Sequence, residues 1–216
     1  PSNTFATLDE WSHYANHKVG FGGTGLLSYA NATVGMPAFP MVSTGKWYVE
    51  FKSETDNTLS YSYMLGIVMN GRNATFYGQV YTGGSANWGK DSAGNGTGGI
   101  AYKPNISTPV ITSNNSDTNY GTQASANDII MMAFELNGDS SKIWFGRNGT
   151  WFNAPGTSDV GDPANGNNPG LTFSQRDEFW GIMMSSSDNA ANNSTKETYV
   201  NFGEGRFGTT AVASAN

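Results

Sequence analysis

The chain has 216 residues and a formal net charge of −6, and only 13% of its residues are charged. Its 11 lysines and arginines are scattered, so nothing resembles the basic stripe with which proteins bind nucleic acid. Cysteine is absent, which excludes disulfides and thiolate metal sites. No apolar run is long enough to span a membrane and no signal peptide is evident. We expect one domain over residues 1–216, without membrane insertion.

Short apolar or alternating runs recur between turn clusters, and each has the length of a β-strand. In chain order they are GLLSYA (25–30), KWYVEF (46–51), YSYMLGIVM (61–69), FYGQVYT (76–82), GIAYK (99–103), DIIMMAFEL (128–136), SKIWFGRN (141–148), FWGIMM (179–184) and TYVNFG (198–203). The intervening segments are rich in Asn, Gly, Asp and Pro, which favour turns. No segment shows a convincing helical face. The pattern predicts an all-β, antiparallel sandwich with long Gly- and Asn-rich loops.

The clearest hairpin starts at Asp128. An apolar run over 129–136 is followed by the turn residues 137–139, and an apolar return over 143–145 leads to a second turn at Asn148-Gly149. Residues 129–134 are apolar on both faces of the expected strand. This pattern indicates a strand in the middle of a sheet.

Four segments occur in the order and spacing of the SPRY domain, a concanavalin A-like β-sandwich of the jelly-roll kind. They are GKWYVEF (45–51), LGIV (65–68), NDIIMMAFELNGDSSKIWFGRNGTW (127–151) and VNFG (200–203). The resemblance covers about residues 26–203 and implies that 204–216 form a linker-like tail. In that family the Gly-Lys-Trp-Tyr step enters a central strand. Trp47 and Phe51 would then face one side of the strand, and Tyr48 and Glu50 the other.

Other phrases resemble SPRY-containing virion proteins of tailed, particularly marine, bacteriophages. They are PSNTFATLDEW at the start, GDPANGNNPG (161–170) and NFGEGRFGTTAVASAN at the end. This resemblance implies a virion location in a fibre or other appendage, with other virion subunits as partners and a homo-oligomeric assembly. The missing initiator Met and the small, polar end lead us to expect a fragment of a longer chain.

The sandwich hypothesis makes a burial prediction. The side chains expected in the core are Trp47, Phe51, Ile67, Ile129, Met131, Phe134, Ile143, Phe145 and Phe202.

Carboxylates give little support for an enzyme. Glycoside hydrolysis needs two carboxyl groups about 5 to 10 Å apart across a cleft. Glu50 and Glu54 are four residues apart, and Glu135 stands alone among apolar neighbours. We therefore expect solvated or structural carboxylates, and no catalytic residues.

Metal sites are equally weak in the sequence. His13 and His17 have a spacing that could clamp zinc on a helix, but no adjacent Glu or third ligand accompanies them. The Asp- and Asn-rich segments 89–96 and 158–168 could hold calcium, although plain turns are favoured. We expect no cofactor, with calcium as the less favoured alternative.

Aromatic residues in polar loops suggest a ligand site in the segments 81–99 and 104–127. The candidate ligand-binding residues are Trp88, Tyr120 and Tyr81 as stacking platforms, with Asn87, Lys90 and Asn119 as hydrogen-bonding neighbours. These aromatics could equally fold back to cap the sandwich edge.

The functional hypothesis is a non-enzymatic binding module that presents loops to a host-surface polysaccharide or protein. One alternative is a purely architectural role, in which the domain spaces or decorates the virion. A second alternative is a concanavalin-like glycan hydrolase or lyase.

Overall fold

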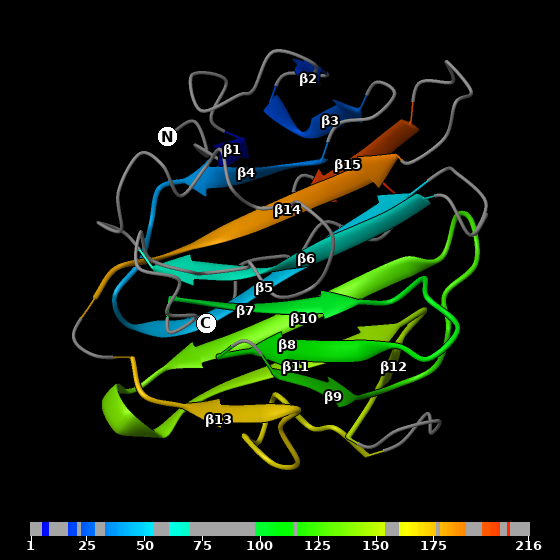
Figure 1. Ribbon diagram of the computed structural model, residues 1–216. Helices are drawn as coiled ribbons and strands as arrows, with labels where there is room; N and C mark the ends of the chain where they lie inside the picture. Colours follow the sequence, from blue (N-terminus) through cyan, green and yellow to red (C-terminus); the bar gives the residue numbers. More distant parts are fainter. Residues whose placement is uncertain are drawn as a thin grey trace.

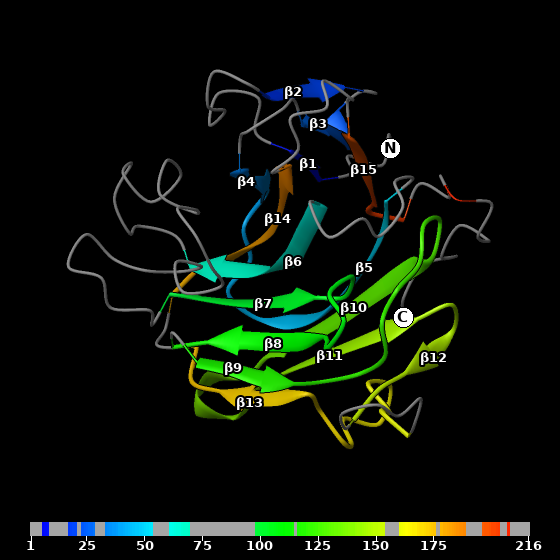
Figure 2. The same ribbon diagram turned by 45° about the vertical axis from the view of Figure 1, so that its right-hand side comes forward.

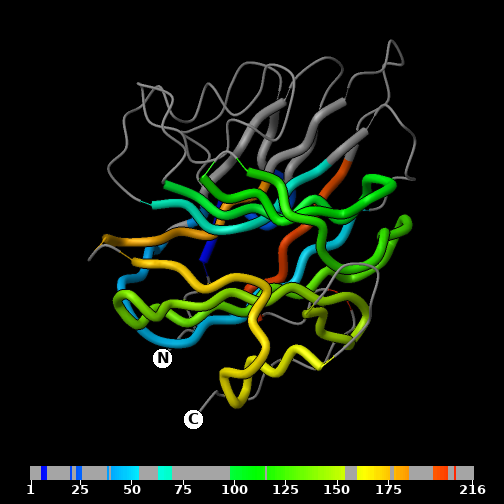
Figure 3. Tube along the Cα trace, turned by 60° about the horizontal axis from the view of Figure 1, so that its bottom comes forward, coloured from blue at the N-terminus to red at the C-terminus, as the bar shows by residue number. Residues whose placement is uncertain are grey.

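Two antiparallel sheets pack face to face and enclose an apolar core (Figures 1 and 3). The computed structural model describes residues 6–8, 17–20, 23–28, 33–53, 61–69, 98–114, 116–153, 160–175, 178–188, 196–203 and 207. Within these residues one sheet has 7 strands and the other has 8. The all-β, antiparallel sandwich predicted from the sequence is confirmed.

The first sheet lies toward the viewer in Figure 2 and includes segments from both halves of the chain. Its strands, in spatial order, are β1 (Thr7–Leu8), β4 (Thr33–Phe39), β14 (Trp180–Asp188), β6 (Tyr61–Met69), β7 (Gly99–Lys103), β8 (Val110–Ser113) and β9 (Ser116–Asn119).

The second sheet has β10 and β5 near its centre. Its strands, in spatial order, are β12 (Thr150–Trp151), β11 (Ser141–Arg147), β10 (Ile129–Leu136), β5 (Gly45–Ser53), β15 (Lys196–Asn201), β3 (Gly25–Ser28) and β2 (His17–Gly20), and β13 (Leu171–Phe173) pairs with β11. A 3-10 turn, η4 (Gly138–Ser140), joins β10 to β11.

Most of the predicted strands are present, and the runs 61–69 and 99–103 have the limits of β6 and β7. The apolar run at 129–136 is flanked by β5 and β11, as its two apolar faces indicated. The predicted strand at 76–82 lies outside the described residues. One prediction is wrong: residues 104–127 are not one long loop, because β8 and β9 extend the first sheet there.

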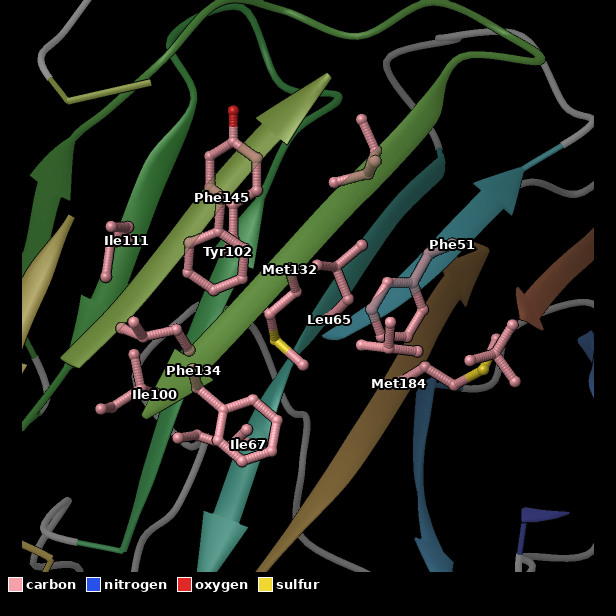
Figure 4. Close-up of a cluster of buried hydrophobic side chains, with 14 of the residues drawn as sticks. Phe51, Leu65, Ile67, Ile100, Tyr102, Ile111, Met132, Phe134, Phe145 and Met184 are labelled. Carbon is pink, nitrogen blue, oxygen red and sulfur yellow. The ribbon is translucent and has the colours of Figure 1, made fainter. Parts of the chain in front are cut away.

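The core contains most of the side chains that the sequence placed there (Figure 4). Fully or almost fully buried are Phe51, Ile67, Met131, Phe134, Ile143 and Phe145. Ile129 and Phe202 are partly exposed. Trp47 is the exception, since 43% of it is exposed although it alternates on the same side of β5 as buried Phe51.

The turn at Asn148-Gly149 connects β11 to β12 and ties both to β10. Asn148 and Gly149 have φ angles of 49° and 87°, in the region that Asn and Gly tolerate best. The Asn148 side chain accepts a hydrogen bond from the Ile129 N–H at 2.8 Å and donates one to Asp128 at 2.6 Å. The predicted second turn is confirmed.

The segment 160–170 lies against the outer face of the second sheet, below β10 and β11 in Figure 3. Lys142 Nζ donates to the Gly166 carbonyl at 2.9 Å, and Trp144 Nε1 donates to the Asn167 carbonyl at 2.7 Å. Trp144 is therefore only 1% exposed, although it points away from the core cluster.

Candidate functional site

The structure describes two of the six residues predicted to bind a ligand. Tyr81, Asn87, Trp88 and Lys90 lie outside the described residues. Asn119 is exposed at the end of the edge strand β9, and Tyr120 directly follows it.

Tyr120 is a core residue, so its prediction as an open stacking platform is wrong. It is 3% exposed, and its ring packs edge-to-face against Tyr102 at 5.7 Å and Phe152 at 6.1 Å. Its hydroxyl donates to the Phe152 carbonyl. Burial raises the pKa of the Tyr120 hydroxyl. The small neighbours that suggested an open ring instead allow close packing, because a Cβ at Gly121 would lie 2.7 Å from the Phe152 ring.

A hollow of about 260 Å³ remains beside Asn119. It is lined by Ser107, Thr108, Pro109, Asn119, Tyr120, Gly121, Thr122 and Gln123. Two buried hydroxyl oxygens, Thr122 Oγ1 and Tyr102 Oη, have no hydrogen-bond partner within the described part of the chain. Hydroxyl and amide side chains surround this hollow, but most of its lining surface is apolar.

A second hollow, of about 180 Å³, lies where the start of β5 meets the start of β14, toward the left of Figure 1. Its lining is apolar and aromatic throughout: Ala6, Pro40, Val42, Trp47, Tyr48, Phe134, Trp180, Ile182 and Phe202. Trp47 and Tyr48 are 43% and 39% exposed. As neighbours on β5 they project to opposite faces, so the Trp47 ring lies on the side of the hollow, and the Tyr48 ring lies on the outer face with Glu50 and Trp151.

Both exposed aromatics are held by hydrogen bonds. Trp47 Nε1 donates to the Thr44 carbonyl at 2.9 Å, and the Tyr48 hydroxyl donates to Glu50 Oε1 at 2.8 Å. The Tyr48 ring also contacts the edge of Trp151, with centroids 6.0 Å apart. Because Trp47 Nε1 already has a partner, the exposed part of the Trp47 ring is apolar surface.

The Glu50 carboxylate accepts hydrogen bonds from two neighbouring side chains. It is 7% exposed and accepts the Tyr48 hydroxyl at Oε1 and Asn201 Nδ2 at Oε2, the latter at 2.7 Å. Burial is the first cause that raises the pKa of Tyr48, followed by its hydrogen bond to Glu50. The prediction that Glu50 is a structural carboxylate is confirmed by these contacts.

No metal-binding cluster is found in the described ranges. There, no three His, Cys, Asp or Glu side chains come together in a way that could hold a metal ion. His17 opens β2, so the helical spacing that would pair it with His13 does not apply at that position. None of the described helices has the length and apolar character to cross a membrane.

Sequence reasoning missed the aromatic hollow because it placed Trp47 in the core. The adjacent pair Trp47-Tyr48 was a usable signal, since neighbours on a strand point to opposite faces and cannot both enter the same core. What leaves Trp47 exposed, however, is the end of the neighbouring strand β15 at Asn201, which the sequence did not reveal.

Comparisons with known proteins agree with this architecture. Neither a scan against protein-family models nor a search of curated proteins finds a match. Among solved structures, the SPRY domain of human HERC1 superposes with a TM-score of 0.57 at 12% identity, covering 91% of this chain and 98% of that domain. The TRIM65 PSpry domain gives 0.57 at 10% identity, covering 92% and 90%. The chain has the fold of a SPRY domain.

Proposed function

We propose that this chain is a non-enzymatic recognition module that binds a segment of another protein in the aromatic hollow at Trp47 and Tyr48. The observation that carries this proposal is the exposure of the Trp47 ring beside a mostly apolar recess. Trp and Tyr are enriched among the residues that dominate binding energy at protein interfaces, and ligand sites are mostly apolar concavities. The likeness to SPRY domains supports a scaffold of the same shape.

The proposed setting is a virion appendage, in line with the phage-like phrases of the sequence. The bound segment would belong to a host-surface protein in a recognition role, or to a neighbouring virion subunit in an architectural role. Attachment to host cells and assembly of the particle distinguish the two roles, because only one of them should fail when the hollow is blocked.

A second candidate ligand is a host-surface polysaccharide at the hollow beside Asn119. The observation that favours it is the set of hydroxyl and amide side chains around this hollow, Ser107, Thr108, Asn119 and Gln123 among them. Such groups can supply the directional hydrogen bonds that sugar hydroxyls need.

The test selects short peptides from a random displayed library on the wild-type protein and measures their affinity calorimetrically. Trp47→Ala should weaken the selected peptides at least about 30-fold, as for an interface anchor worth about 2 kcal/mol. Phe179→Ala is the matched control, because Phe179 is 51% exposed but does not line the hollow. Binding should also survive EDTA.

Two results would contradict the proposal: failure to select any peptide, or equal affinity for the wild type and Trp47→Ala. Thermal melts of each variant separate lost binding from lost folding. The second candidate would be favoured if the protein binds host envelope polysaccharide, Asn119→Ala abolishes this binding and Trp47→Ala leaves it unchanged.

A further inference from the structure

The first half of β5 has a strand neighbour on one side only. β10 pairs with β5 along Gly45–Lys52, whereas β15 pairs only with Glu50–Ser53. In Figure 2, β15 accordingly ends well short of the left-hand end of β5. On the β15 side, no described strand pairs with residues 45–49, which therefore form a short free edge within the described part of the chain.

The direction of the main-chain groups on β5 follows from its neighbours. The Ile129 carbonyl accepts the Asn148 N–H, so odd-numbered residues of β10 direct their polar groups toward β11 and even-numbered ones toward β5. Even β10 residues pair with odd β5 residues, as in Phe134 with Trp47. The even residues of β5, Lys46 and Tyr48 among them, therefore direct N–H and C=O toward β15.

β15 ends before it reaches the N–H and C=O groups of Lys46 and Tyr48. Asn201 pairs with Glu50, and two residues later the Gly203 N–H bonds the Asn201 side chain at 3.0 Å instead of a β5 carbonyl. Gly203 has a φ of 110°, which turns the chain away. Within the described residues, the main-chain groups of Lys46 and Tyr48 have no hydrogen-bond partner on this side.

We propose that this free edge binds an extended peptide as an added strand, in line with β15, with one large apolar side chain of the peptide in the hollow. This rests on the proposed function and specifies how the segment is held. The edge and the hollow adjoin, because Trp47 and Tyr48 belong to both and Phe202, just past β15, lines the hollow. Main-chain bonds would give affinity, and the recess would select the side chain.

The chemistry of the site defines the occupant. Four main-chain groups at alternate residues match an extended chain and not a helix, whose own groups are already paired. A mostly apolar recess of about 180 Å³ suits an aromatic or long aliphatic side chain.

The experiment uses a library-selected peptide whose binding depends on Trp47, and scans it with single backbone N-methyl groups. Each methyl removes one N–H donor. The expected result is alternation: methylation at the two positions that face Lys46 and Tyr48 should weaken binding at least about 3-fold, and the residues between them should tolerate it.

A variant pair tests the same edge from the protein side. Lys46→Pro removes the N–H that faces the free edge, a position where a strand tolerates proline, and should weaken the peptide about 3- to 10-fold. Lys46→Ala keeps the N–H and should bind as the wild type does. Equal binding by both variants would overturn the strand model.

Other outcomes separate this inference from the proposed function. If a peptide binds through Trp47 but N-methylation weakens it equally at all positions, or at every third or fourth position, the recognition site is retained and the added strand is wrong. A library that yields no Trp47-dependent peptide overturns both. The wild-type protein could instead self-associate, and Lys46→Pro could abolish this self-association. That result would assign the edge to a second copy of this chain and would overturn the peptide as its occupant.

Discussion

Trp47 and Phe51 show how much the environment of a residue depends on its neighbour across the sheet. Both project to the same side of β5, yet Phe51 is fully buried and Trp47 is 43% exposed. Val200 of β15 lies opposite Phe51, whereas no β15 residue reaches Trp47. The same side-chain type on the same strand can therefore serve as core or as ligand surface, depending on where the adjacent strand ends.

Glu50 provides the residue-scale prediction. Replacing Glu50 by Ala leaves the Tyr48 hydroxyl and the buried Asn201 amide without their carboxylate partner. We expect the free energy of unfolding to fall by about 2 to 4 kcal/mol, measured by urea denaturation. Glu178→Ala, at an exposed carboxylate, should change it by less than about 0.5 kcal/mol. Equal effects of the two substitutions would show that the Glu50 contacts add no stability.

Tyr120 marks the limit of sequence reasoning at this scale. Small polar neighbours made it resemble a loop aromatic, but the chain after β9 turns inward and the ring fills space beside Phe145 and Phe152. Burial of an isolated aromatic is decided by partners distant in the sequence, so local composition could not predict it.

Among the elements, the β10–β11 hairpin was predictable and β8 and β9 were not. The hairpin carries its signals locally: an apolar run, and turns built on Asn and Gly. β9 has the sequence SDTN with all four residues exposed, so it shows no apolar alternation. It is held by pairing with β8 at the sheet edge, as Val110 with Asn119. The residues of such a strand do not themselves predict that it pairs with a neighbour.

Two glycines, Gly146 in β11 and Gly149 in the turn from β11 to β12, give the element-scale prediction. Gly149→Ala meets no atom within 4 Å, so its cost comes from the φ of 87° alone and should be about 1 kcal/mol. At Gly146 an added Cβ would lie 2.4 Å from the Thr150 carbonyl oxygen and 2.7 Å from Met131. Gly146→Ala should cost about 2 to 3 kcal/mol in the same denaturation assay. The reverse order would contradict this account of the hairpin.

For the whole molecule, the order of several short motifs was enough to predict the fold, but the candidate site was not predictable. Strand order is encoded in segments such as 45–51 and 127–151, which lie side by side in the sheet as β5 and β10. The aromatic hollow instead depends on three distant pieces meeting, the starts of β5 and β14 and the end of β15. Such a meeting is set by strand lengths that composition does not determine.

Stability at alkaline pH is the whole-molecule prediction, because two buried tyrosines lie between the sheets. Burial is the largest cause that raises the pKa values of Tyr102 and Tyr120 above the ordinary 10.0. Above pH 10.0 the unfolded chain loses these protons while the folded chain keeps them, so unfolding becomes more favourable. The free energy of unfolding should be insensitive to these groups below that pH, and above it should fall by up to about 1.4 kcal/mol per pH unit for each tyrosine.

Tyr102→Phe tests this pH dependence with little disturbance. The Tyr102 hydroxyl is buried and has no hydrogen-bond partner within the described residues, so its removal should leave stability at neutral pH unchanged or slightly higher. The variant should also lose stability less steeply above pH 10.0, as measured by denaturant titrations at stepped pH. A loss of more than about 1 kcal/mol at neutral pH would mean that this hydroxyl contributes a favourable hydrogen bond, and an unchanged alkaline slope would mean that Tyr102 ionises as readily in the folded as in the unfolded chain.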